Sequence, residues 1–344
     1  MPSVDADKPA AQPAPGIGAG TRFGWPGLIG HALPWVIIVA FYFTAGGYLS
    51  LGTQVLIWIL FALSIDLALG YAGIVTLGHA AFFGLGAYVA GLFAIHVSPD
   101  PILGHIAAIV IAALFGLITG AIILHTTGVT FLMLSLVIAS ALFEYANQAR
   151  DLTGGDDGLQ GIKIAPLFGV FPFNIFGETA YVYAAGVLFI WFLISWRIVH
   201  SPFGRSLDGI RQNTRRMRAI GTPVWWRLLA IYTLSAAMAG SAGALSAHAV
   251  RFVGLSVLSL LTSGIVTVML ILGGTRRLYG AFVGAAVYYV MQDTTARISP
   301  YFWEFVVGLM LIATVLFLEG GLLDLGQVGK RLFDRLRRRA DDVR

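Results

Sequence analysis

The stretch that decides the fold is GYAGIVTLGHAAFFGLGAY, residues 70–88. It is apolar enough to lie in a lipid bilayer, but its many glycines would make a uniform helix weak. It also places Thr76, His79 and Tyr88 at a depth where lipid penalises polar groups, so these side chains are expected to face the interior of a helix bundle. The stretch therefore indicates a packed membrane segment that is broken or re-entrant where the glycines lie.

The composition of the whole chain agrees with a membrane protein. Of its 344 residues, 58% are hydrophobic and 11% are charged, and the mean hydropathy is +0.82. Soluble domains contain roughly 25% charged residues, so a water-soluble enzyme is excluded. The absence of cysteine excludes disulfide frameworks, thiol catalysis and thiolate metal sites. The net charge of +5 does not indicate a nucleic-acid partner, because no Lys or Arg lies between Arg22 and Arg150.

Apolar runs of about 20 residues, the length that a bilayer core of about 30 Å requires, recur along the chain. We therefore predict an all-α polytopic membrane protein with about ten transmembrane segments. These segments are expected at residues 30–48, 53–70, 72–97, 102–124, 128–148, 179–199, 228–250, 257–274, 279–293 and 301–320. The least regular are 72–97, which is glycine-rich, and 279–293, which is short.

The basic residues predict the orientation, because Lys and Arg near span ends mark the cytoplasmic side. With an even number of crossings, the basic clusters in loop 200–227, in turn 275–278 and in the C-terminal tail share one side with the N-terminus. Loop 149–178 then faces outward. The expected division is a disordered cytoplasmic tail at 1–27, a transmembrane domain at 28–325, and a basic amphipathic tail at 326–344 that lies on the anionic inner leaflet.

Two loops contain candidate interaction sites. In loop 200–227, Pro202 and Gly204 end a span, and residues 205–220 are predicted to form one amphipathic helix with Leu207, Ile210 and Ile220 near one face. The loop either docks a partner or serves only as a topology signal. In loop 149–178, the Gly- and Asp-rich run 153–161 predicts tight turns, either as an ordered cap or as a plain connection.

A few polar residues near or within the spans have two interpretations each. Asp66 and Glu144 could relay protons or form packing hydrogen bonds. Arg251 could reach the interface or contact a substrate carboxylate. His79 could be a structural residue bonded to a backbone carbonyl, or it could line a translocation path.

Three parts of the opening stretch, GYAG at 70–73, LGHA at 77–80 and FGLGAY at 83–88, resemble the signature of LivM-type permeases. These are the membrane subunits of branched-chain amino acid ABC importers. The resemblance continues through 152–162, 201–221, 234–240, 272–284 and 317–322, so it covers about residues 28–326.

The resemblance implies a permease subunit in a bacterial inner membrane, with both termini cytoplasmic, that forms half of a translocation pathway. Its implied partners are a second homologous permease, two ABC ATPase subunits and a periplasmic substrate-binding protein, besides the lipid bilayer. The chain has no phosphate-binding loop of its own. ATP is therefore expected to bind to the partner subunits, and we predict no catalytic residue, metal or cofactor here.

The resemblance also suggests three groups of site residues. The expected translocation-path or helix-packing residues are Thr76, Gly78, His79, Gly84, Gly86 and Tyr88. The expected ATPase-coupling residues are Gly204, Arg205, Arg211, Asn213, Arg216 and Gly221. The expected docking residues for the binding protein are Thr153, Gly154, Gly155, Asp157 and Gly158.

The chain departs from the family pattern at several positions. The cytoplasmic loop reads RQNT at 211–214, where the family tends to have two acids. Arg276 and Arg277 replace a small Gly-Thr pair, and Ile74 and Thr76 replace polar family residues. Branched-chain amino acids are the expected substrates, with urea, short amides or small carboxylates as alternatives. A proton-coupled secondary transporter is the alternative from another class.

Overall fold

The computed structural model describes residues 25–44, 46–174, 177–298 and 321–324, with isolated positions between 305 and 316. The chain divides into two units, Met1–Thr44 and Ala45–Arg344. The first contains α1 (Trp25–Thr44), and the second contains all the other elements. Within the described residues the structure is helical, with two isolated β-bridges and no longer strand. The predicted all-α polytopic membrane fold is confirmed.

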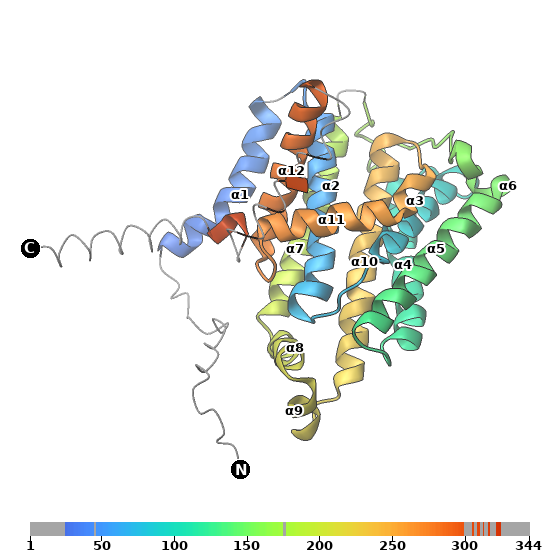
Figure 1. Ribbon diagram of the computed structural model, residues 1–344. Coiled ribbons are helices and arrows are strands. Elements are labelled where there is room, and N and C mark those ends of the chain that lie inside the picture. The colour runs from blue at the N-terminus through green and yellow to red at the C-terminus, as the bar shows by residue number, and fades with distance from the viewer. Residues whose placement is uncertain are drawn as a thin grey trace, which may run out of the picture. The chain divides into compact units, whose positions relative to one another are not determined.

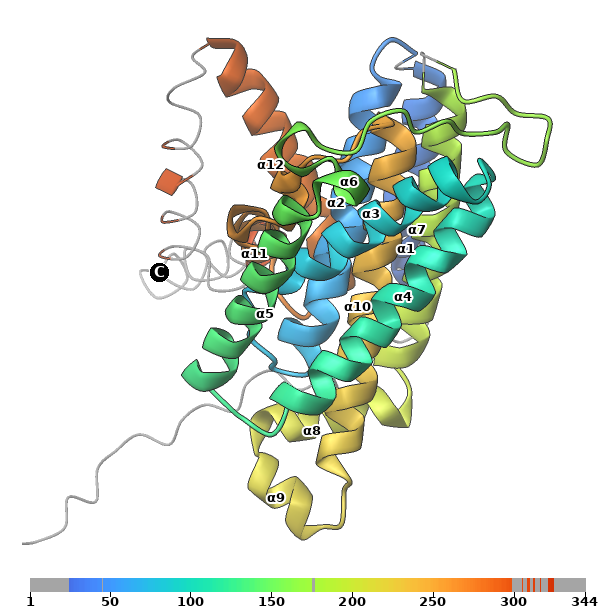
Figure 2. The same ribbon diagram turned by 90° about the vertical axis from the view of Figure 1, so that its right-hand side faces the viewer.

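The second unit is a bundle of long helices joined by short ones (Figures 1 and 2). The long helices are α2 (Leu49–Ile65), α3 (His79–His96), α4 (Pro101–Ile123), α5 (Val129–Gln148), α7 (Glu178–Val199), α10 (Val224–Val250), α11 (Leu260–Gly273) and α12 (Leu278–Ile298). The short ones are α6 (Arg150–Thr153), α8 (Pro202–Gln212) and α9 (Thr214–Ala219), with the π-helical turn η1 (Asp66–Tyr71) and the 3₁₀ turns η2 (Gly155–Asp157), η3 (Leu255–Leu258) and η4 (Leu322–Asp324).

The core of the bundle lies where α10 packs against α2, α3 and α4. The apolar parts of α2 and α10 are each 78% buried, whereas that of α5 is 22% buried and lies on the outside. Small residues permit this close packing: a Cβ added to Gly240 would overlap that of Ala112, and one added to Gly243 would overlap the carbonyl oxygen of Phe83. In lipid, such contacts between small residues are a principal source of helix association.

The glycine-rich stretch at 70–88 is broken, as its composition predicts. Helix α2 continues into the π-helical turn η1, and a non-helical segment at 72–78 then leads into α3. Gly73 has a positive φ of 74° in this segment, a conformation that glycine adopts without steric cost. The predicted span at 72–97 is therefore shorter, and its helix begins only at His79.

The predicted count of ten spans is not confirmed. Within the described residues, six helices are long and apolar enough to cross a membrane, and a seventh span is added if α11 and α12 are counted as one. Those two helices, predicted as separate spans at 257–274 and 279–293, are bent by 114° at their junction. Helix α11 has 14 residues, which is shorter than the roughly 20 residues that a bilayer requires. In Figure 1, α11 lies across the direction of α2 and α10.

Several predicted segments fall largely outside the described residues. They are the N-terminal tail 1–27, the span at 301–320 and the C-terminal tail 326–344. Of the N-terminal tail, only Trp25–Gly27 are described, and they begin α1.

Candidate functional site

Two short helices, α8 and α9, project from one end of the bundle (Figure 1). Helix α8 begins at Pro202, and the hydroxyl of Ser201 caps it by accepting a hydrogen bond from the Gly204 nitrogen at 3.3 Å. Helix α9 begins after Asn213, whose side-chain oxygen accepts from the Arg216 nitrogen at 2.9 Å. Ser and Asn are favoured caps because they satisfy free backbone donors.

The prediction of one helix over 205–220 is therefore wrong, because Asn213 leaves the helical conformation and starts a second helix. The predicted apolar face is also only partly right. Leu207 and Ile210 are buried against the bundle, but Ile220 is 69% exposed. Gly204 lies against the last turn of α7, where a Cβ would overlap the carbonyl oxygens of Val199 and Ile198.

Arg205, Arg211, Asn213, Arg216 and Gly221 are all exposed at this end of the bundle. Gly221 has a φ of 83° and closes the turn after α9 with open space around it. The structure thus presents a basic surface on a helix whose apolar face is anchored in the bundle.

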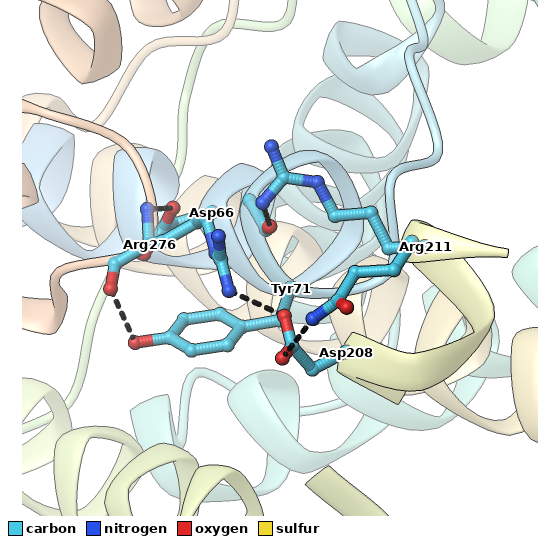
Figure 3. Close-up of polar contacts among 7 residues, drawn as sticks. Asp66, Tyr71, Asp208, Arg211 and Arg276 are labelled. Carbon is cyan, nitrogen blue, oxygen red and sulfur yellow. Dashed lines mark hydrogen bonds and ion pairs between the residues drawn. The ribbon is translucent and has the colours of Figure 1, made fainter. Parts of the chain in front are cut away.

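The π-helical turn at the end of α2 meets the turn between α11 and α12 next to α8 (Figure 3). The carboxylate oxygen Oδ1 of buried Asp66 accepts a hydrogen bond from the Arg276 nitrogen at 2.8 Å. The Tyr71 hydroxyl donates to the Arg276 carbonyl at 3.0 Å. Gly70 leaves room for this arrangement, because a Cβ there would overlap Asp66 Oδ1 and lie 3.0 Å from the Arg276 nitrogen.

Helix α8 is bonded to the same junction by two side chains. Asp208 forms an ion pair with the Arg276 guanidinium, and Arg211 donates from Nη1 to the Gly70 carbonyl at 2.7 Å. The other Asp208 oxygen, Oδ2, accepts from the Gln212 amide at 2.8 Å. Burial and the charge of Arg276 lower the pKa of Arg211, against the effects of Asp208 and Asp66. Because arginine has a very high ordinary pKa, it stays charged.

A cavity of about 630 Å³ lies beside Arg211. Its walls are the non-helical segment 72–75, the α4–α5 loop at 124–128, and the start of α10 at 223–226. A Cβ on Gly73 would come within 2.9 Å of the Arg211 side chain, so the GYAG part of the signature forms both the junction and one wall of this cavity.

The later part of the signature packs α3 into the bundle. Nε2 of fully buried His79 lies 3.0 Å from Ser235 Oγ and 3.2 Å from Ser64 Oγ. The Ser235 hydroxyl donates to the Ser64 carbonyl, and the Ser64 hydroxyl donates to the Phe61 carbonyl. Because each hydroxyl has only one proton, the ring nitrogen Nε2 is the donor to both hydroxyl oxygens. His79 thus joins α3 to α2 and α10 through side chains, not through the backbone carbonyl that we expected.

The remaining residues of this group also lie in close contacts. A Cβ on Gly78 would overlap the Ser135 carbonyl oxygen, one on Gly84 would overlap Leu258, and one on Gly86 would overlap the Gly240 carbonyl oxygen. Buried Thr76 accepts from the Gly78 nitrogen at 3.1 Å. Tyr88 is buried in a cluster with Leu159 and Val253.

At the opposite end of the bundle, the run 153–161 is an ordered set of turns. The Thr153 hydroxyl donates to the Ala146 carbonyl at 2.5 Å. Gly154, Gly155 and Gly158 all have positive φ, and Asp157 is exposed. Leu159 and Val253 exchange backbone hydrogen bonds of 2.8 and 3.2 Å, which fix the run against the segment after α10.

A model of the family described as "Branched-chain amino acid transport system / permease component" matches residues 47–315. The chain belongs to this family. Two similar relatives are the high-affinity branched-chain amino acid transport system permease proteins LivM of Salmonella typhimurium and Escherichia coli, each 24% identical over 309 residues. Both alignments cover 81% of this chain and 71% of the relative. The predicted LivM-type membership is thereby confirmed.

A second kind of relative matches a smaller part of the permease. The autoinducer 2 import system permease protein LsrC of an Enterobacter strain is 29% identical over 146 residues, which cover 40% of this chain and 41% of the relative. No solved structure matches the permease significantly.

Sequence reasoning on this permease missed the partners of Asp66 and the role of Asp208. A signal for Asp208 was present, since it is the only acid in the loop 200–227 among its arginines. Arg251, which could reach the interface or contact a substrate carboxylate, donates to the Phe173 carbonyl at 2.6 Å. Glu144 is exposed on the outer helix α5 and accepts from Gln148 at 2.8 Å. Within the part of the permease that the structure describes, no group of acidic or histidine side chains is arranged to hold a metal ion.

Proposed function

We propose that this chain is the permease subunit of an ABC importer and forms half of the translocation pathway for branched-chain amino acids. Its proposed partners are a second homologous permease, two ABC ATPase subunits and a periplasmic binding protein. The proposed location is a bacterial inner membrane, with both termini and helix α8 on the cytoplasmic side. Family membership over residues 47–315 is the observation that supports this proposal most strongly.

The two-sided character of α8 supports its use as the ATPase-coupling helix. Leu207 and Ile210 anchor it in the bundle, while Arg205 on α8 and Arg216 on the adjoining α9 are exposed. Guanidinium groups bind carboxylates with two parallel hydrogen bonds. An acidic groove on an ATPase subunit would complement this surface, and the bonds of Asp208 and Arg211 to the junction would transmit its movement to the spans.

The ordered turns at the other end support a docking role for the binding protein. Thr153, Gly154, Gly155 and Gly158 hold the run in one conformation, and Asp157 is exposed on it. A rigid surface costs less entropy to bind than a mobile loop. A basic patch on the binding protein is the expected complement.

Branched-chain amino acids are proposed as substrates because the LivM relatives align over most of the chain. Autoinducer 2 is a second candidate, since part of the chain is similar to LsrC. Urea, short amides and small carboxylates are the further alternatives. A proton-coupled mechanism has less support, because Asp66 accepts a backbone hydrogen bond at the junction and Glu144 lies on an exposed helix face.

The proposal is tested by reconstitution. The chain is co-expressed with the permease, ATPase and binding-protein genes that are expected beside its own gene, and the purified complex is placed in proteoliposomes. We expect leucine uptake that needs ATP inside and binding protein outside, is blocked by vanadate and survives an uncoupler. Uptake that an uncoupler abolishes at constant ATP would contradict the ABC assignment. Uptake of autoinducer 2 or urea in place of leucine would contradict the substrate.

A further inference from the structure

We propose that Arg276 is a positioning residue that ties the turn between α11 and α12 to helix α8, so that a displacement of α8 moves this helix pair with it. The inference rests on the proposed coupling function of α8. It assigns a mechanical role to a residue outside the loop 200–227, in the turn where two arginines depart from the family pattern.

The first observation is that Arg276 is held at three points (Figure 3). Its backbone nitrogen bonds to Asp66, its carbonyl oxygen bonds to Tyr71, and its guanidinium pairs with Asp208. The first two partners belong to the turn at the end of α2, whereas Asp208 belongs to α8. Arg276 therefore joins three segments that lie far apart in the sequence, and only its side chain reaches α8.

The second observation is the backbone of Arg276 itself. Its φ is 65°, which places a non-glycine residue in the left-handed region. A Cβ is disfavoured there, so such residues persist only where surrounding contacts determine the conformation. The fold tolerates this strain at a position from which a side chain of the α11–α12 turn pairs with Asp208 on α8. A glycine would satisfy both backbone bonds without strain, so neither of them explains the arginine.

The third observation is that α11 and α12 are locked to each other next to this turn. A Cβ on Gly284 would overlap the Met269 carbonyl oxygen, and one on Gly280 would overlap the Gly274 carbonyl oxygen. Ser263 on α11 accepts a hydrogen bond from the Ala80 nitrogen at the start of α3, at 2.8 Å. A displacement of the turn is thus transmitted to both helices and to the glycine-rich stretch.

The ion pair is suited to transmit force because both partners are partly shielded from water. The side chains of Arg276 and Asp208 are 25% and 13% exposed. Shielded charge pairs are screened less than pairs at an open surface. Gln212 bonds to the second oxygen of Asp208, Oδ2, at 2.8 Å, whereas Arg276 pairs with Oδ1.

The test is the variant Arg276→Gly in the reconstituted complex. Glycine removes the ion pair and relieves the left-handed strain, while the bonds to Asp66 and Tyr71 are kept. We expect unchanged subunit assembly, an unchanged or higher unfolding temperature, and unchanged basal ATPase activity. Binding-protein-stimulated ATPase activity and leucine uptake should both fall at least tenfold.

Three further variants complete the test. Asp208→Asn should reproduce the loss of stimulation, because it removes the charge from the same pair. The exchange Asp208→Arg with Arg276→Asp should restore at least a third of the stimulated activity, because Asp tolerates the left-handed region. Gln212→Ala is the matched control, since it removes only the other bond to Asp208, and it should keep near-normal stimulation.

The outcomes separate this inference from the proposed function. A wild-type complex without ATP-driven uptake would contradict the proposed function before any variant is compared. A wild-type complex that transports, together with an Arg276→Gly variant that keeps full stimulation, would overturn the positioning role alone. A lower unfolding temperature or loss of assembly in Arg276→Gly would also overturn it, since the residue would then serve the fold and not the coupling.

Discussion

Gly86 on α3 and Gly240 on α10 meet backbone to backbone, since a Cβ added to Gly86 would overlap the carbonyl oxygen of Gly240. The overlap is with backbone, so no side-chain rotation can relieve it. This contact brings α3 into the buried core of the bundle.

Gly86→Ala should therefore destabilise the permease, although alanine is a better helix former than glycine. Overpacking a tight contact typically costs about 1–3 kcal/mol. The matched control is Gly186→Ala on α7, where nothing lies within 4 Å of the added Cβ. Thermal unfolding of the purified complex should show a lower midpoint for Gly86→Ala only. Equal midpoints would show that α3 and α10 separate easily.

His79 and Ser235 should behave as one energetic unit. Replacing either by alanine removes the bond between them, while the remaining group keeps its contact to Ser64. The loss of one such hydrogen bond typically costs about 0.5–1.5 kcal/mol. The double variant should cost less than the sum of the two single variants. His96→Ala, at the exposed end of the same helix, serves as the control. Strict additivity in unfolding measurements would indicate that the two side chains do not interact.

The orientation can be tested because the chain contains no cysteine. Single cysteines are introduced at Asp157 and at Arg215, both of which are exposed. In intact cells with a permeabilised outer membrane, an impermeant maleimide should label position 157 and not position 215. The reverse pattern, or equal labelling, would overturn the proposed topology.

The double variant Arg205→Ala with Arg216→Ala should weaken ATPase binding without unfolding the permease. Both residues are exposed, and the cap of α9 uses only the backbone nitrogen of Arg216. Truncating central charged residues of an interface typically costs about 2 kcal/mol or more. Co-purification of the ATPase should fall by roughly tenfold or more, while the second permease is retained. Lys163→Ala, on the opposite end of the bundle, should leave ATPase binding intact.

Gly158→Ala should reduce stimulation by the binding protein. Gly158 has a φ of 70°, and an added Cβ would approach Phe252 and the Val253 carbonyl. Gly161 has a similar φ of 77° but open space around it, so Gly161→Ala introduces the backbone strain without the overlap. Stimulated ATPase activity should fall much further for Gly158→Ala. Similar activities in the two variants would indicate that the conformation of the run 153–161 does not affect stimulation by the binding protein.

Much of the fold could be predicted from apolar run length. The runs around Leu56, Ala108 and Leu188 become membrane-length helices near their predicted bounds. The break after Gly70 was also predictable, because glycine-rich apolar sequence disfavours a continuous helix. The bend between α11 and α12 was not predictable, since hydropathy describes each segment by itself and does not report the angle between them.

The candidate site was predicted less completely. The arginines of α8 and the turns at Gly154 and Gly158 follow from local composition, which is visible in short windows. The bonds of Arg276 join residues that lie 210 and 68 positions away in the sequence. Their pairing depends on how α2, α8 and the α11–α12 turn come together in space, and no local pattern contains that information.

The left-handed backbone of Arg276 also constrains the order in which this junction could have arisen. An arginine placed in that turn before an acid existed at position 208 would introduce strain, on the order of 1–2 kcal/mol, with no ion pair to offset it. An acid at 208 that faces a glycine keeps its bond to Gln212. A change to arginine in the α11–α12 turn is therefore less costly when Asp208 is already present on α8 than when it is absent.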